Sequence, residues 1–281
     1  MNLTSPSQVR ALVDSIGFKP SKLLGQNFLI DRNILDIIVR AADISAADHV
    51  LEVGPGLGVV TEQLLDRAGR VTAVEKDRRL FSYLSGKFHD VKNVEFINAD
   101  MLDVAIDGLT GVGKLVSNLP YSVGSRIIVN MIMADHSPER MVVTVQLEVA
   151  QRIAAKPNGR EYGVLSVWAQ SGYDVEIVKN VSPGCFWPKP EVTSAIVSFR
   201  KHNRFRMEPV QRKLFFALTK EAFTHRRKQL ASRLVRMPGI VDVDQKEVAI
   251  ILEQIGVDAM ARPENLGVDK WCELVKCLGR G

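Results

Sequence analysis

An amide, a proline and an aromatic ring stand together at the end of one predicted strand. Residues 115–118 form a short, mainly apolar run, which is typical of a parallel strand covered on both faces. Pro120 cannot continue a strand, so Asn118 and Tyr121 should lie at its carboxyl end, where open α/β sheets bind ligands. The amide oxygen of Asn118 and a backbone carbonyl freed by the proline could hold an exocyclic amine while Tyr121 stacks on its base. The alternative is a strand-ending turn with an incidental tyrosine.

A glycine-rich turn follows another predicted strand, residues 49–53. The turn is Gly54–Gly58, and a predicted helix continues from Val60. Glycines allow a ligand to approach the backbone, and the helix N-terminus offers free N–H groups. The spacing G-x-G-x-G lacks the later glycine of the dinucleotide fingerprint, and Glu52 would oppose a pyrophosphate. The turn therefore fits a dinucleotide poorly.

Acidic side chains end the next two predicted strands. Glu75 closes the strand at residues 70–75, and a carboxylate there can accept both hydroxyls of a ribose. Asp100 follows the strand at residues 93–98 and could bind the amino group of an adenine, with Met101 as an apolar wall. These side chains predict a nucleoside-containing ligand; the alternative for Glu75 is a surface residue at a strand end.

Strands and helices alternate in the pattern up to about residue 200. Further strands are predicted at residues 140–147, 173–181 and 192–199, with helices from residue 60 and at residues 123–133, 148–155 and 162–171. This alternation favours a mainly parallel, doubly wound α/β sheet. After residue 204 only helices are predicted. We therefore expect an N-terminal extension (1–24), a catalytic domain (25–203) and a helical domain (204–281).

The composition is that of a globular protein, with 281 residues of which 46% are hydrophobic and 25% charged. The sequence contains no apolar run of about 18 residues, so we expect no membrane span. Nor does it begin with a basic segment followed by an apolar one, so no signal peptide is visible. Its 3 cysteines are too few and too scattered for a disulfide framework or a four-cysteine zinc site. We expect a cytoplasmic protein without a metal.

Basic residues gather in one segment of the chain. Between Arg200 and Arg236 there are 12 Lys and Arg residues but only 2 Glu, although the whole chain has a net charge of only +5. A solvated helix face usually mixes both signs, so this segregation favours contact with a nucleic-acid backbone. The predicted RNA-binding residues are Arg226, Arg227, Lys228 and Arg233.

Several motifs occur together in a familiar order. Over about residues 18–280 the chain resembles the ribosomal RNA adenine dimethyltransferase family, in particular its bacterial housekeeping branch that acts on small-subunit RNA. The motifs are Gly25–Leu29, Glu52–Gly58, Glu75, Asp100, Asn118–Tyr121, Gln146–Ala150 and Phe186–Ser194.

The resemblance implies a Rossmann-like, seven-stranded methyltransferase sheet with a small C-terminal helical domain, and S-adenosylmethionine as methyl donor. It implies that Asn27 and Leu29 close over the cofactor, that Gly54 lines its methionine end and that Asn118 borders the sulfonium. The cofactor-binding residues implied are Gln26, Asn27, Leu29, Gly54, Gly56, Glu75, Lys76, Asp100, Met101 and Asn118. A cationic sulfonium needs no phosphate cradle, so Glu52 is compatible with this cofactor.

The implied reaction is two methyl transfers to N6 of each of two adjacent adenosines near the 3′ end of small-subunit ribosomal RNA. Asn118 and the carbonyl of Leu119 would accept hydrogen bonds from the N6 amino group, which frees the nitrogen lone pair for attack. Tyr121 and Phe186 would hold the flipped base between them. The implied partner is the small ribosomal subunit with its RNA, and we expect a monomer.

The chain departs from the family pattern at two places, and other functions remain open. Leu147 stands where the family commonly has Lys, and residues 122–126 are less typical. One alternative is the sibling that dimethylates a large-subunit adenosine and confers antibiotic resistance. Another is a non-catalytic ribosome-assembly factor, although an intact Glu75, Asp100 and Asn118 argue against lost catalysis. A DNA adenine methyltransferase is more distant.

Overall fold

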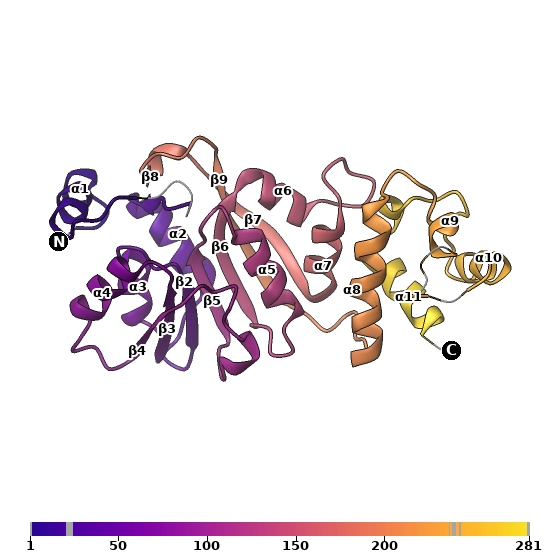
Figure 1. The fold of residues 1–281 in the computed structure, drawn as a ribbon, viewed down its shortest axis with the longest axis horizontal. Coiled ribbons are helices and arrows are strands. Elements are labelled where there is room, and N and C mark those ends of the chain that lie inside the picture. The colour runs from indigo at the N-terminus through magenta and orange to yellow at the C-terminus, as the bar shows by residue number, and fades with distance from the viewer. Residues whose placement is uncertain (1, 21–24, 236, 238–239, 242, 280–281) are drawn as a thin grey trace. The chain divides into compact units, whose positions relative to one another are not determined.

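The computed structural model describes residues 2–20, 25–235, 237, 240–241 and 243–279 (Figure 1). The chain divides into two compact units. The first, which we call the sheet unit, comprises Met1–Ala150 and Asp174–Lys201. The second, the helical unit, comprises Gln151–Tyr173 and His202–Gly281.

The main sheet has seven strands in the order β4-β3-β2-β5-β6-β9-β7. Neighbouring strands from β4 to β6 run parallel, and β9 runs antiparallel to β6. The mainly parallel, seven-stranded sheet predicted from the sequence is thereby confirmed. The strands are β2 (His49–Val53), β3 (Arg70–Glu75), β4 (Val94–Asn98), β5 (Lys114–Asn118), β6 (Arg140–Gln146), β7 (Tyr173–Val181) and β9 (Ser194–Lys201).

The strand order reverses between β2 and β5, and this reversal prepares a binding site. From β2 the chain builds outward through β3 to β4, then returns to the other side of β2 with β5. The helices that follow β2 and β5 therefore diverge to opposite faces of the sheet. Between their N-termini, at the carboxyl ends of these strands, an α/β sheet leaves a crevice for a ligand.

Apolar side chains alternate between the two faces of the strands. On one face, Val50, Val116 and Val142 are buried in a cluster with helices α1 (Pro6–Ser15), α2 (Arg32–Ala42) and α3 (Val59–Leu65). Leu51 and Leu115, the sequence neighbours of Val50 and Val116, are also fully buried and point to the opposite face. Both faces are covered, which explains the apolar runs in the sequence. The remaining helices of the sheet unit are α4 (Arg78–Lys87), which the sequence analysis did not predict, α5 (Gly124–Met133), and the short η1 (Ile106–Gly108) and η2 (Pro183–Cys185).

A second, two-stranded sheet joins two motifs that lie far apart in the chain. Strand β1 (Phe28–Leu29) pairs antiparallel with β8 (Phe186–Trp187). The rings of Phe28 and Trp187 stack with centroids 6.3 Å apart. Phe18, from the predicted N-terminal extension, packs against Phe28 at 6.0 Å and is only 4% exposed. The described part of the extension therefore belongs to the core of the sheet unit.

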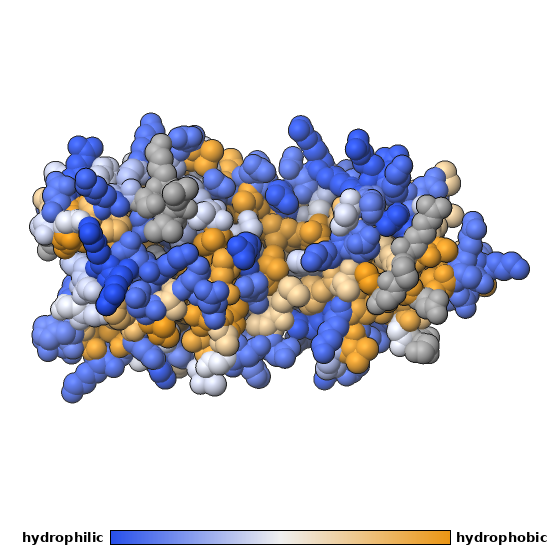
Figure 2. Space-filling view, in the orientation of Figure 1, coloured by the Kyte–Doolittle hydropathy of each residue, from blue (hydrophilic) through white to orange (hydrophobic). Residues whose placement is uncertain are grey.

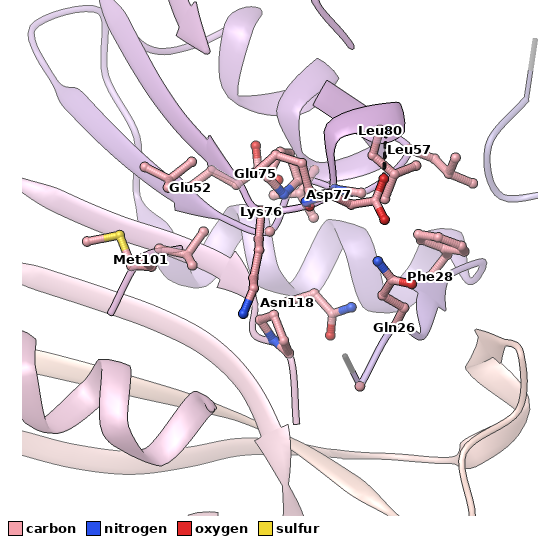
Figure 3. A pocket seen from close by; sticks show the side chains of 18 of the residues that line it. Gln26, Phe28, Glu52, Leu57, Glu75, Lys76, Asp77, Leu80, Met101 and Asn118 are labelled. Carbon is pink, nitrogen blue, oxygen red and sulfur yellow. Dashed lines mark hydrogen bonds between the residues drawn. The ribbon is translucent and has the colours of Figure 1, made fainter. Parts of the chain in front are cut away.

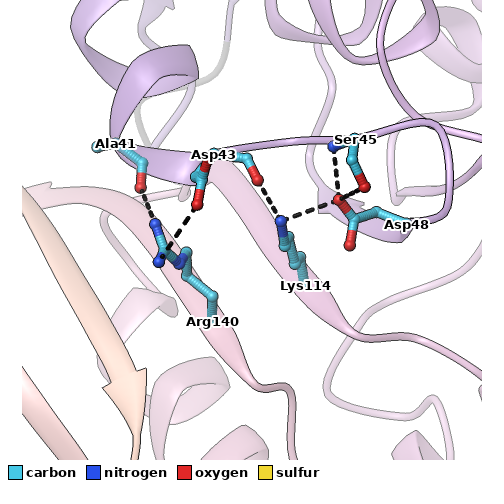
Figure 4. Close-up of polar contacts among 6 residues, drawn as sticks. All are labelled: Ala41, Asp43, Ser45, Asp48, Lys114 and Arg140. Carbon is cyan, nitrogen blue, oxygen red and sulfur yellow. Dashed lines mark hydrogen bonds and ion pairs between the residues drawn. The ribbon is translucent and has the colours of Figure 1, made fainter.

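The amino ends of β5 and β6 carry a network of charged and polar groups (Figure 4). Lys114 Nζ donates to the Asp43 carbonyl and to Asp48 Oδ2, the latter at 2.9 Å. Asp48 Oδ2 also accepts hydrogen bonds from the backbone N–H and the hydroxyl of Ser45. Arg140 Nη1 donates to the Ala41 carbonyl at 3.0 Å, and its Nη2 lies 3.6 Å from Asp43 Oδ2. Every charge in this network faces an opposite charge or a backbone dipole.

The helical unit is held together by side-chain hydrogen bonds as well as apolar contacts. Trp168 Nε1 donates to Thr219 Oγ1 at 2.8 Å, and the Tyr162 hydroxyl donates to the Leu266 carbonyl at 3.0 Å. Residues 151–173 lie within the range predicted for the catalytic domain, but they pack with the C-terminal helices. The helices are α7 (Val164–Gly172), α8 (Pro209–Thr224), α9 (Leu230–Leu234), α10 (Gln245–Gln254), η3 (Pro263–Asn265) and α11 (Val268–Leu278), while α6 (Leu147–Ala154) spans the boundary between the units.

Most residues visible on the face shown in Figure 2 are hydrophilic, with smaller apolar areas between them. No helix in the described part of the chain is long and apolar enough to cross a membrane.

Candidate functional site

A pocket lies at the carboxyl ends of the central strands of the sheet unit (Figure 3). The side chains of Gln26, Lys76 and Asn118 point into it from three separate segments. All the residues predicted to bind the cofactor line this one pocket, although they come from five parts of the chain. They are Gln26, Asn27, Leu29, Gly54, Gly56, Glu75, Lys76, Asp100, Met101 and Asn118.

The glycine turn has little free space above it. Gly54 and Gly56 have φ angles of +67° and +61°, which favour glycine. A Cβ at Gly56 would lie 3.0 Å from the Phe28 ring, and one at Gly54 would lie 3.2 Å from Cγ of Pro120. The absence of side chains at these glycines allows close packing by two other motifs, Gly25–Leu29, which contains β1, and the strand-end motif Asn118–Tyr121. Three motifs are thereby brought to one place.

Glu75 is tied to the glycine turn by its carboxylate. Oε2 accepts a hydrogen bond from the Gly56 N–H at 3.1 Å, and Oε1 accepts one from the Asp77 N–H at 2.8 Å. The residue is only 5% exposed, and burial raises the pKa of its carboxyl although these two hydrogen bonds oppose the shift. The side chain is held rigidly at the pocket wall.

Glu52 is a second buried acid in the pocket, in addition to the predicted site residues. It is 2% exposed, and the Thr61 hydroxyl donates to its Oε2 at 2.7 Å. Burial raises the pKa of Glu52 to about 8, and the nearby charge of Glu75 adds to the shift. Among the described residues, no Lys or Arg forms an ion pair with either acid. The pocket is thus suited to a ligand that carries positive charge.

Asp100 is paired across the pocket with Lys76. Lys76 Nζ donates to Asp100 Oδ2 at 2.7 Å, and the Leu102 N–H donates to Oδ1 at 3.0 Å. The hydrogen bond from Lys76 is the main reason why the pKa of Asp100 lies below its ordinary value. Met101 is 4% exposed and forms part of the apolar wall, as the sequence predicted.

The side-chain amide of Asn118 is bound on one side only. Its Nδ2 donates to the Asn27 carbonyl at 2.9 Å, whereas its Oδ1 is buried and has no hydrogen-bond partner. A buried acceptor without a donor is unfavourable by about 1–3 kcal/mol, so this oxygen marks a place for an incoming N–H group.

The two aromatic residues predicted to hold a base contact each other directly. The rings of Tyr121 and Phe186 meet edge to face, with centroids 6.4 Å apart and planes at 79°. The Tyr121 hydroxyl is hydrogen-bonded to the Ser194 hydroxyl, and Phe186 is 2% exposed. Burial raises the pKa of Tyr121, so its phenol stays neutral. The rings do not form a parallel slot in this arrangement.

The four predicted RNA-binding residues fall into two groups. Arg226 pairs with Glu264 and donates to the Gly159 carbonyl at 3.2 Å. Arg233 lies 3.2 Å from Glu221, with its side chain only 17% exposed. These two arginines are engaged within the helical unit. Exposed Arg227 and Lys228 instead line a polar groove together with Gln229, Ser232, Met260, Arg262, Glu264 and Asn265.

Several pocket residues had no separate indication in the sequence. Leu3, Leu57, Asp77 and Leu80 line the pocket, and Leu3 is only 4% exposed. Leu57 lies within the predicted glycine turn, and Asp77 lies two residues after Glu75. For Leu3, no periodicity or motif points to the site. In the described residues, no group of three or more His, Cys, Asp or Glu side chains could hold a metal ion.

Comparison with known proteins gives a consistent result. Residues 17–279 match the family model described as ribosomal RNA adenine dimethylase. Ribosomal RNA small subunit methyltransferase A of Clostridium botulinum (strain Loch Maree / Type A3) is 35% identical over 272 residues, which cover 96% of this chain and 98% of that relative.

Two solved structures share the fold. A dimethyladenosine transferase from Plasmodium falciparum aligns with a TM-score of 0.76 at 24% identity, covering 88% of this chain and 95% of that chain. The 23S rRNA methyltransferase ErmE aligns with a TM-score of 0.70 at 28% identity, covering 90% of this chain and 100% of that chain. With a family model that spans nearly all of the sequence and a full-length relative at 35% identity, this chain belongs to the ribosomal RNA adenine dimethylase family.

Proposed function

We propose that this protein uses S-adenosylmethionine to dimethylate N6 of two adjacent adenosines near the 3′ end of small-subunit ribosomal RNA, in the cytoplasm during ribosome biogenesis. The observation that carries the proposal is the amide of Asn118, whose buried, unpaired oxygen lies in the pocket formed by the family motifs. The small-subunit enzymes in the comparison are 35–37% identical to this chain, against 28% for ErmE, which favours the small subunit over the large one.

The pocket suits S-adenosylmethionine in charge and in shape. The cofactor supplies a methyl group on a positively charged sulfur, and it also carries an ammonium group. Glu52 and Glu75 are buried acids without a Lys or Arg partner in the described chain, so they favour a cationic ligand. Glu75 would accept the ribose hydroxyls, while Asp100 and Met101 would receive the adenine. Asn27 and Leu29 would close over the cofactor, and Gly54 would line its methionine end.

The residues at the end of β5 would prepare the adenine amine for methylation. The lone pair on N6 is delocalised into the purine ring, so the amine is a weak nucleophile. Asn118 Oδ1 and the Leu119 carbonyl would accept hydrogen bonds from the N6 amino group, which directs the nitrogen toward tetrahedral geometry and frees its lone pair. Positioning and preorganised acceptors then supply much of the rate enhancement. The methylated nitrogen is acidic and releases its proton afterwards.

Tyr121 would stack on the target base, which is flipped out of the RNA. Stacking contributes about 1–3 kcal/mol per base, comparable with the cost of unstacking. Phe186 would cover the other face of the base. Since the two rings now meet edge to face, a base can enter between them only if the rings separate.

In the helical unit, Arg227 and Lys228 would contact the RNA backbone, because they are exposed and line the polar groove. Replacing both by Glu should weaken binding to the small subunit and lower the slope of log affinity against log salt by about one to two. The matched control is Lys246→Glu, an exposed lysine on α10 outside the groove. An unchanged slope in the double variant would place the RNA surface elsewhere. Arg226 and Arg233 are better tested for stability, since both form ion pairs within the unit.

The decisive experiment measures tritium transfer from labelled S-adenosylmethionine to small subunits that lack these methyl groups, with large subunits and naked DNA assayed in parallel. Dimethyladenosine at two adjacent positions of the small-subunit RNA, and little label elsewhere, is the expected result. Label on the large subunit would select the resistance-type activity instead. Tight binding to small subunits without transfer would identify a non-catalytic assembly factor.

A further inference from the structure

The segment Gly25–Asn27 lies directly against the strand-end motif that carries Asn118. Gly25 has a φ of +65°, and a Cβ at this position would lie 2.8 Å from the Tyr121 backbone nitrogen and 3.0 Å from that of Ser122. These neighbours are backbone atoms, which cannot move aside as a flexible side chain can. Only glycine allows this approach.

The position of the Asn27 carbonyl is held from both sides. Before it, the Asn27 side chain donates from Nδ2 to the Gly25 carbonyl at 3.2 Å. After it, Phe28 and Leu29 pair with β8, and the Ile30 N–H donates to the Cys185 carbonyl at 2.8 Å. The carbonyl that accepts from Asn118 therefore belongs to a well-supported stretch of backbone.

This contact decides which end of the Asn118 amide faces the pocket. The oxygen and the NH₂ group of an amide are nearly equal in shape, but only the oxygen can accept a hydrogen bond. An amide rotated by half a turn would oppose its NH₂ group to the N–H groups of an incoming amine. It would also bring its oxygen against the Asn27 carbonyl, where two acceptors repel each other. The carbonyl thus excludes the unproductive orientation.

We infer that Gly25–Asn27 is a positioning element for the reaction: the main-chain carbonyl of Asn27 holds the amide of Asn118 with its oxygen toward the target amine. Asn27 acts through Asn118 and needs no contact with the base for this purpose. The inference rests on the proposed function, since the productive orientation is defined by an amine substrate.

The test is Asn118→Asp, which replaces the NH₂ group by a second oxygen. If the Asn27 carbonyl fixes the orientation, the substituted carboxyl works only while protonated, because its O–H then donates to Asn27 and its other oxygen accepts from N6. Turnover of the variant, at saturating cofactor and relative to the unsubstituted protein, should then fall as pH rises. The fall approaches about tenfold per pH unit above the pKa of the new carboxyl. If only an acceptor were needed, the ionised carboxylate would serve equally well, and relative turnover would stay level or rise with pH.

The unsubstituted protein corrects for the other titratable groups around the site, namely Glu52, Glu75, Lys76, Asp77, Asp100 and Tyr121. Its own activity also separates the two hypotheses. Adenine methylation by the unsubstituted protein with a level or rising profile for the variant would overturn the inference alone. Absence of methylation by the unsubstituted protein would overturn the proposed function.

A second readout does not depend on activity. A carboxyl that faces the Asn27 carbonyl has a raised pKa in the folded protein, so its stabilising protonated form is lost as pH rises. The melting temperature of Asn118→Asp should therefore fall progressively below that of the unsubstituted protein between about pH 5 and pH 8. Asn93→Asp is the matched control, since the Asn93 Nδ2 also donates to backbone carbonyls, at 3.0 and 3.2 Å, but outside the pocket. It should show the same trend in melting temperature and an unchanged pH profile of turnover. A melting difference for Asn118→Asp that does not change with pH would contradict the inference even if the variant is inactive.

Discussion

The two ends of the central strands treat their polar groups in opposite ways. At the amino ends of β5 and β6, Lys114 and Arg140 pair with acids and with backbone carbonyls (Figure 4). Burial alone would raise the pKa of Asp48, but hydrogen bonds from Lys114 and Ser45 outweigh it and hold this pKa below its ordinary value. At the carboxyl ends, Glu52 and Glu75 have raised pKa values, and Asn118 Oδ1 has no partner.

This difference separates stability from function along a single set of strands. Groups at the amino ends satisfy one another, so their removal should mainly affect folding. Groups at the carboxyl ends are left for a ligand to satisfy, so their removal should mainly affect binding or reaction. The following substitutions test whether the separation holds.

The largest effect is expected for Asn118→Ala, which removes the acceptor for the amine. Methyl transfer should fall by at least about a hundredfold, as for the loss of one preorganised group in other active sites. The affinity for S-adenosylmethionine, measured by calorimetry, should stay within about tenfold. The free energy of unfolding should change by no more than about 1 kcal/mol, because the variant loses one hydrogen bond but also one unpaired oxygen. Loss of cofactor binding would instead show that Asn118 has a structural role.

Glu52→Gln tests whether ionisation of a buried acid at the carboxyl ends of the strands destabilises the folded protein. The pKa of Glu52 is about 8 in the folded protein against an ordinary 4.5, so the protonated form stabilises the fold below pH 4.5 and this contribution is lost as pH rises to 8. The neutral amide can keep the hydrogen bond from Thr61. Without ligand, the variant should match the unsubstituted protein near pH 5 and exceed it by a few kcal/mol in urea unfolding at pH 8. A difference that is constant with pH would mean that Glu52 is not held neutral.

Lys114→Met and Lys76→Met make the same change at the two ends. Lys114 and its partner Asp48 have side chains only 15% and 19% exposed, so loss of this pair should lower the free energy of unfolding by roughly 1–2 kcal/mol without changing turnover. Lys76 is 56% exposed, and its replacement should lower the free energy by less than about 1 kcal/mol. Chemical denaturation measures the free energy of unfolding of each variant, and single-turnover rates measure its methyl transfer. Equal losses of stability would remove the distinction between the two ends.

Much of the sheet and the pocket could be predicted from the sequence because the relevant patterns are local. Apolar runs locate the seven strands, and the chain order implies that their carboxyl ends meet at one edge. Residues that end these strands, such as Glu75, Asp100 and Asn118, were therefore expected to lie together, and they line one pocket. Helix α4 was missed, although Asp77 caps it and Leu80 and Leu84 are spaced as on a buried helix face.

Contacts between distant segments could not be predicted in this way. Asn118 meets a carbonyl 91 residues earlier in the chain, and β1 pairs with β8 through only two residues on each side. No periodicity specifies such short pairings. Likewise, the basic cluster was recognised from composition, but its division into internal ion pairs and groove residues depends on Glu221 and Glu264, which approach only after folding. Composition shows how much charge is present, whereas the fold decides which charges remain available.

Residues 151–173 belong to the helical unit, although the segments before and after them in the chain belong to the sheet unit. This arrangement affects folding during synthesis. This segment leaves the translating ribosome before its partners exist: Trp168 bonds to a residue 51 positions later, and Tyr162 to one 104 positions later. At about 5–20 residues per second, Tyr162 waits some 5–20 seconds for its partner. During this interval α7 lacks the C-terminal helices with which it packs in the folded unit. A chain that stops after residue 203 never supplies the missing helices, so it would leave this segment permanently exposed and prone to aggregation.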